Sequence, residues 1–249
     1  RQRQMCIRDR SRLEQLLQTH PFTEDECARA EQLISRLIAL KLTKYNVGQS
    51  NWQRPAAKRV ILVPGQVESD ASIRLGSPVL KTNLELLQAV RSSNPEAYIL
   101  YKPHPDVQAG MRIAGQADRD ASAYCNETLG DEDMAHLLTQ VDEVHTLTSL
   151  TGFEALIRGV PVVCYGQPFY SGWGLTTDIY PISRRSRNLT VNQLAAATLL
   201  LYPTYINWRT GCYTSAEVAL TELERNKAHY KGLSFWQKIL RKILVFKRF

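Results

Sequence analysis

Three stretches decide the fold: VILVPGQVESDASI at residues 60–73, YILYKPHPD at residues 98–106 and VHTLTSLTGFEALIRGVPVVCYG at residues 144–166. In each, a short aliphatic or β-branched run ends abruptly in polar and turn-forming residues. Such runs are typical of buried parallel strands, and open α/β sheets bind their ligands at the carboxyl ends of those strands. We therefore expect the three following loops to form one functional site.

Strands and helices alternate from residue 59 onward, which predicts an α/β fold with a Rossmann-like parallel sheet. The expected strands are 59–63, 97–102, 143–146 and 160–164. The expected helices are 82–93, 109–117, 131–140, 151–158, 190–201, 214–228 and 234–247. The sequence contains neither a GxGxxG nor a Walker A motif, which argues against a dinucleotide oxidoreductase and a P-loop enzyme.

The remaining chain divides around this sheet. Residues 1–10 lack apolar periodicity and are expected to be an artefact or disordered. Residues 11–57 are expected to form two helices and a linker, with Thr23 and Glu26 as the capping box of the second helix. The Rossmann-like domain is expected over 58–180, and a helical C-terminal region with a basic amphipathic tail over 181–249.

Charge and cysteine content limit the cellular setting. The net charge is +7, but no acidic residue occurs after residue 225, where basic residues alternate with apolar ones at helical spacing. This pattern predicts that residues 234–249 lie on an anionic membrane surface or pack on the protein. The clustering of bases in one tail argues against nucleic-acid binding. Five scattered cysteines and the lack of a long apolar run predict a cytoplasmic location.

Two loops carry groups suited to sugar or phosphate chemistry. Gln66, Glu68 and Asp70 follow the first strand, where carboxylates act as nucleophile or acid/base, or where Asp70 simply caps the next helix. His104 lies between two prolines that fix the backbone around it. Its imidazole is expected to hydrogen-bond a phosphate or to be satisfied by the local backbone.

Hydroxyl groups gather in the third loop, where a helix is expected to begin. Ser149 and Thr151 are candidate ligands of an anion, and Gly152 would let a phosphate approach the backbone. Glu154 is either a ribose ligand or the partner of Thr151 in a capping box. The aromatic loop at residues 168–176, with Tyr170 and Trp173, predicts either a wall for cytosine or sugar, or an aromatic cluster that closes the domain.

Four blocks in order carry a family resemblance: PGQVESDASI, YKPHPDV, VHTLTSLTGFEAL and YGQPFYSGWGLT. Over about residues 60–213 the chain resembles the capsule polysaccharide β-Kdo glycosyltransferases of the KpsC type. The resemblance implies the nucleotide-binding half of a GT-B-type enzyme, which transfers Kdo from CMP-Kdo to a Kdo-primed lipid acceptor with retention of configuration. It implies a peripheral protein on the inner face of the inner membrane of Gram-negative bacteria. No cofactor and no metal are expected.

The resemblance also implies roles for individual residues. Asp70 would be the nucleophile, with Glu68 as acid/base and Gln66 holding donor or acceptor oxygens. His104 would be the third catalytic residue, which stabilises the charge on the departing CMP phosphate. The donor would be bound by Lys102, His104, Pro105, Ser149, Thr151, Gly152 and Glu154. Two alternatives remain at this point, a CDP-glycerol-type phosphotransferase of surface polymers and a non-catalytic membrane-docking fragment of the capsule machinery.

Overall fold

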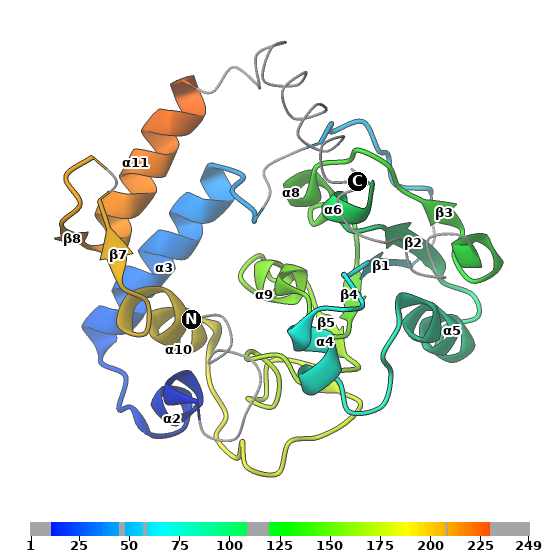
Figure 1. Ribbon diagram of the computed structural model, residues 1–249, viewed down its shortest axis with the longest axis horizontal. Coiled ribbons are helices and arrows are strands. Elements are labelled where there is room, and N and C mark those ends of the chain that lie inside the picture. Colours follow the sequence, from blue (N-terminus) through cyan, green and yellow to red (C-terminus); the bar gives the residue numbers. More distant parts are fainter. Residues whose placement is uncertain (1–10, 45–47, 57–58, 109–119, 208, 230–249) are drawn as a thin grey trace, which may run out of the picture. The chain divides into compact units, whose positions relative to one another are not determined.

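The computed structural model describes residues 11–44, 48–56, 59–108, 120–207 and 209–229 (Figure 1). The chain divides into two compact units, of which the first ends at Tyr202 and the second begins at Pro203. The sequence placed this boundary near residue 180. The difference arises because α10 (Val191–Ala195) and the following π-helix η2 (Ala196–Leu201) pack against α3 (Glu24–Ala39).

The first unit is built on a six-stranded sheet in which all strand pairs are parallel. The strands are β1 (Val60–Pro64), β2 (Tyr98–Lys102), β3 (Glu127–Thr128), β4 (Glu143–Thr146), β5 (Val162–Cys164) and β6 (Thr177–Asp178). Their order is β3-β2-β1-β4-β5-β6, the doubly wound order of Rossmann folds. The expected α/β class and the four expected strands are confirmed.

The strand β1 is buried along its whole length because helices cover both faces of the sheet. Val60 and Leu62 face the core that includes Phe153 of α9 (Leu150–Leu156). Ile61 and Val63 face the opposite core, which includes Leu86, Leu87 and Val90 of α5 (Asn83–Ser93). Figure 1 shows α9 and α5 on either side of the strands. Successive side chains of a strand point to opposite faces, so an uninterrupted apolar run needs two cores.

Short helices occupy the connections after the strands. They are α4 (Ala71–Gly76), α6 (Pro105–Gln108), the 3-10 helix η1 (Ala121–Ala123) and α8 (Met134–Leu137). The helix expected over 131–140 is thus much shorter, and the one expected over 109–117 lies outside the described residues. The capping box of Thr82 and Glu85 that starts α5 is present as its sequence spacing indicates.

The N-terminal helices α2 (Arg12–Thr19) and α3 belong to the same unit as the sheet. Leu13 and Leu17 of α2 share a core cluster with β1 and β4. The capping box of Thr23 and Glu26 at the start of α3 is confirmed. Residues 48–56 are more than the expected linker, because Trp52 is buried and its Nε1 donates a 2.9 Å hydrogen bond to Glu127.

Glu14 of α2 accepts hydrogen bonds from two arginines far along the chain. Arg184 Nε lies 2.5 Å from its Oε1, and Arg185 Nη2 lies 3.0 Å from its Oε2. The buried Arg185 guanidinium also donates to the carbonyls of Pro168 and Ser171. The helix α2 is therefore tied to the aromatic loop that follows β5.

The second unit contains a hairpin of β7 (Tyr205–Ile206) and β8 (Tyr213–Thr214), followed by α11 (Ala216–His229). The helix expected over 214–228 is confirmed, and Ser215 caps it, because Ser215 Oγ accepts a hydrogen bond from the Val218 N–H. The amphipathic tail at 234–249 lies outside the described residues. Among those that are described, no helix has the length and apolar character needed to cross a membrane.

Candidate functional site

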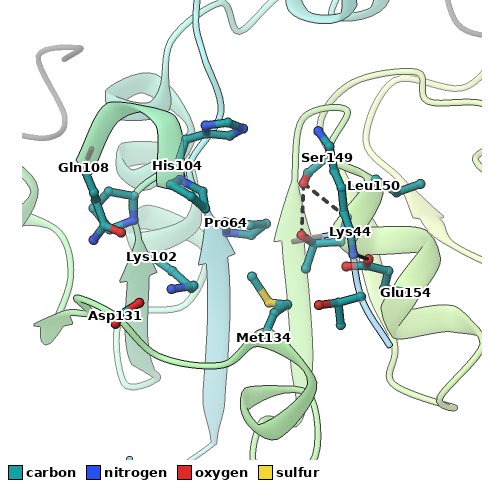
Figure 2. Close-up of a pocket in the computed structure, with 15 residues that line it drawn as sticks. Lys44, Pro64, Lys102, His104, Gln108, Asp131, Met134, Ser149, Leu150 and Glu154 are labelled. Atoms are coloured by element: carbon teal, nitrogen blue, oxygen red, sulfur yellow. Dashed lines mark hydrogen bonds between the residues drawn. The ribbon is translucent and has the colours of Figure 1, made fainter. Parts of the chain in front are cut away.

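A pocket lies at the carboxyl ends of β1, β2 and β4 (Figure 2). The β1–β4 pair is the point at which the strand order reverses, and ligands of doubly wound sheets bind outside the strand ends there. All three loops singled out in the sequence reach this pocket. Its lining consists of Thr43, Lys44, Pro64, Gly65, Lys102, Pro103, His104, Pro105, Gln108, Asp131, Met134, Ser149, Leu150, Thr151 and Glu154.

Lys102 is the last residue of β2 and is only 6% exposed. Its Nζ donates a 3.1 Å hydrogen bond to the Gly130 carbonyl. Burial lowers the pKa of the ammonium, while the carboxylates of Asp131, Glu132 and Asp133 act in the opposite direction. The pocket therefore has a positioned amine whose charge is supported by nearby acids.

His104 is oriented by the turn that begins α6. Its Nδ1 accepts a 3.1 Å hydrogen bond from the Asp106 N–H, so in the neutral ring the proton resides on Nε2. The alternative in which the local backbone satisfies His104 is thus correct for one ring nitrogen, and the ring still lines the pocket. Gly65 lies beneath this turn, because a Cβ there would come within 3.2 Å of the His104 nitrogen.

Ser149 caps α9 and shapes the opposite wall. Its Oγ accepts a 3.2 Å hydrogen bond from the Thr151 N–H, and its hydroxyl also contacts the Thr151 hydroxyl at 3.2 Å. Both side chains line the pocket, as the clustering of hydroxyls indicated. Gly152, in contrast, faces the Tyr170 side chain, because a Cβ at this position would lie 2.2 Å from the Tyr170 hydroxyl oxygen. Its lack of a side chain makes room for Tyr170 and not for a phosphate.

Glu154 is 7% exposed and lies deep in the same wall. Its Oε1 accepts a 2.7 Å hydrogen bond from the Lys44 N–H. Burial raises the pKa of this carboxyl, although Lys44 and Arg158 oppose the shift. The capping-box interpretation of Glu154 is not realised, because Ser149, and not Thr151, caps the helix.

Gln66 is buried between the β1 and β4 loops and does not line the pocket. Its Oε1 accepts from the Thr148 N–H at 2.9 Å, and its Nε2 donates to the Thr148 hydroxyl at 3.0 Å. Its own N–H donates to Asn83 Oδ1 at 2.9 Å. These bonds fix the two loops to each other, so Gln66 holds the walls of the pocket in place without lining it.

The two carboxylates that follow Gln66 lie outside the pocket lining. Glu68 accepts a 2.8 Å hydrogen bond from the Asn83 N–H at the start of α5. Asp70 is exposed at the start of α4 and makes no capping bond with its side chain. The loop therefore leaves the Asp70 carboxylate accessible to solvent beside the strand ends.

Tyr170 and Trp173 are both fully buried and neither lines the pocket. Trp173 Nε1 donates to the Phe169 carbonyl at 2.8 Å, and the Arg185 guanidinium lies 5.4 Å from the ring centroid. The Tyr170 hydroxyl donates to the Ser149 carbonyl. The alternative of an aromatic cluster that closes the domain describes their packing. Through its hydrogen bond to Ser149, Tyr170 also stabilises the start of α9.

Several lining residues were not anticipated from the sequence. Thr43 and Lys44 come from the segment after α3, and Asp131 and Met134 come from the region of α8. No strand-end signal precedes them, so only tertiary structure identifies them. Within the described part of the chain, no group of three or more His, Cys, Asp or Glu residues is placed to hold a metal ion.

Comparison with known proteins identifies the group to which this architecture is related. A family model described as "Capsule polysaccharide biosynthesis protein" matches residues 3–210. The capsule polysaccharide modification protein LipA of Neisseria meningitidis serogroup A is 52% identical over 223 residues, which cover 89% of this chain and 32% of LipA. The chain thus spans about a third of the length of that relative.

Two solved structures share the fold. The chain is 45% identical to the beta Kdo 2,7 transferase of Thermosulfurimonas dismutans KpsC, with a TM-score of 0.76, covering 88% of this chain and 67% of that one. It is 32% identical to the beta Kdo 2,4 transferase of the same KpsC, also with a TM-score of 0.76, covering 85% and 67%. These similarities match a chain built as one half of a GT-B-like enzyme.

Proposed function

Because the chain belongs to the capsule polysaccharide biosynthesis protein family and is of the KpsC type, we propose that it carries the donor site of a Kdo transferase acting in capsule linker synthesis. The donor is CMP-Kdo and the acceptor is a Kdo-primed lipid. The observation that carries the proposal is the pocket at the β1–β4 switch point, where Lys102 and His104 face Ser149 and Glu154.

The phosphate and the ribose of the nucleotide each have a chemically suitable partner in this pocket. The Nε2–H of His104 and the Lys102 ammonium are donors for phosphate oxygens, with the Ser149 and Thr151 hydroxyls on the other wall. Glu154 offers carboxylate oxygens to ribose hydroxyls. Donors positioned around the phosphate would stabilise the charge that develops as CMP departs.

The proposed transfer retains the configuration of the donor and proceeds by two displacements. In the first, an Asp70 carboxylate oxygen bonds to the anomeric carbon of Kdo while the bond from that carbon to the phosphate oxygen breaks and CMP leaves. In the second, an acceptor hydroxyl bonds to the same carbon, Asp70 departs, and Glu68 receives the hydroxyl proton. The exposure of Asp70 next to the strand ends supports this role.

The higher identity to the 2,7 transferase, 45% against 32%, supports formation of a β-2,7 linkage. The same identity favours Kdo transfer over CDP-glycerol phosphotransfer. A location on the inner face of the inner membrane follows from the proposed lipid acceptor. The basic, apolar sequence of residues 234–249 is its proposed anchor.

Calorimetric titration with CMP tests the donor site. The wild-type chain should bind CMP, His104→Ala should bind it at least tenfold more weakly, and Asp70→Asn should bind it normally. With CMP-Kdo and a Kdo-primed glycolipid, Asp70→Asn should then lose transfer. A folded wild-type chain that does not bind CMP would refute the donor site, and transfer by Asp70→Asn would refute the nucleophile.

A further inference from the structure

The segment Leu42–Lys44, which follows α3, forms a wall of the pocket although it lies outside the strand-end loops. Thr43 and Lys44 both line the pocket. The segment is bonded to Glu154 and Arg158, which are more than 100 residues away in sequence. It therefore adds to the site groups that neither the parallel sheet nor its crossovers supply.

Two side chains of the α9 region hold the backbone of this segment. Glu154 Oε1 accepts the Lys44 N–H at 2.7 Å, and Arg158 Nη2 donates to the Leu42 carbonyl at 2.8 Å. Arg158 is itself fixed, because its Nη1 donates to the Glu154 carbonyl at 2.9 Å. Bonds to the main chain on both sides of Thr43 set the path of the segment, and hence the position from which the Lys44 side chain starts.

The Lys44 side chain lies where it would meet an anionic group of a ligand. Figure 2 shows it beside Ser149 and above Glu154, on the wall opposite His104. A phosphate between these walls would have the imidazole on one side and the Lys44 ammonium on the other. The lysine thereby supplies positive charge to the wall on which hydroxyls are the other donors.

We propose that Lys44 contacts the phosphate of the bound nucleotide and that Arg158 is the residue that positions it. This inference rests on the proposed function, since it assigns a further residue to the same donor site. It also gives the N-terminal helical segment a part in substrate binding in addition to its part in packing.

The test is titration of the wild-type chain and variants with CMP and with cytidine, which lacks the phosphate. Lys44→Gln should weaken CMP binding by roughly three- to tenfold at low salt and reduce its salt dependence. Cytidine binding should be unchanged. The matched control is Lys41→Gln. This variant also removes one positive charge, but Lys41 lies three residues earlier and its side chain lines a different hollow. It should bind CMP like the wild type.

Arg158→Met should weaken CMP binding to a similar degree. Combining it with Lys44→Gln should add little, since both variants remove the same contact between Lys44 and the phosphate. Melting temperatures would show that each variant is folded. If the wild type binds CMP and Lys44→Gln binds it equally well, or loses cytidine binding in proportion, the role of Lys44 is refuted while the donor site stands. Additive losses would refute the positioning role of Arg158, and absence of CMP binding by the wild type would overturn both proposals.

Discussion

Replacing Gly152 with alanine should destabilise the protein through a steric conflict with Tyr170. A Cβ on residue 152 would lie 2.2 Å from the Tyr170 hydroxyl oxygen, 2.6 Å from Cζ and 2.8 Å from Cε2. The ring is fully buried and cannot swing into solvent. Either the ring or the start of α9 must therefore shift.

The expected cost combines three contributions. Overpacking of a well-packed core costs about 1–3 kcal/mol. A ring that moves also loses its hydrogen bond to the Ser149 carbonyl, worth about 0.5–1.5 kcal/mol. The higher helix propensity of alanine returns up to about 1 kcal/mol. We expect a net loss of about 1–3 kcal/mol.

Urea unfolding of the wild type, Gly152→Ala, Tyr170→Phe and the double variant measures this cost. Because Tyr170→Phe removes the atom closest to the new methyl group, the double variant should lose less stability than the sum of the single variants. Gly130→Ala is the control, since a Cβ there meets no atom within 4 Å, and it should stay within about 0.5 kcal/mol of the wild type. Unchanged stability of Gly152→Ala, or strictly additive losses, would refute the steric explanation.

Two further predictions concern buried charge. Burial lowers the pKa of His145 below its ordinary value of 6.5, although Glu143 at 2.9 Å opposes the shift and Arg59 adds to it. As the pH falls, the unfolded chain therefore takes up the proton before the folded one, so the free energy of unfolding should decrease below about pH 6.5. In His145→Gln, the free energy of unfolding measured in urea should depend less on pH between 7.5 and 5.5. An equally steep curve in the variant would contradict this. Glu14→Ala leaves the buried Arg185 without its carboxylate partner and should lower the free energy of unfolding in urea by about 3–5 kcal/mol. A decrease of less than about 1 kcal/mol would contradict a structural role for the pair.

The sequence predicted the central strands well because three of them, β1, β2 and β5, are short runs of mainly apolar residues. It missed β3 and β6, since two residues carry no periodicity. It also treated residues 48–56 as a linker, because glycine and proline obscured the single buried side chain of Trp52. Local pattern therefore identified the strands at the centre of the sheet but not those at its edges.

The candidate site was predictable to the extent that it consists of strand ends. Lys102, His104 and Ser149 directly follow such runs and do line the pocket. Lys44 carries no comparable signal, because side-chain bonds from α9 bring it there. Gly152 shows a second limit: a sequence can indicate that a position needs a small residue, but not whether a ligand or a tyrosine ring fills the space.

The ion pair between Glu14 and Arg185 has a consequence for biosynthesis. The two residues are 171 positions apart, and a ribosome adding about 5–20 residues per second needs roughly 10–35 s to synthesise the chain between them. Throughout that interval the apolar stripe of α2, with Leu13 and Leu17, has no completed core to enter. The helix α2 is thus synthesised well before its partner Arg185, and its apolar side chains can complete their packing only afterwards.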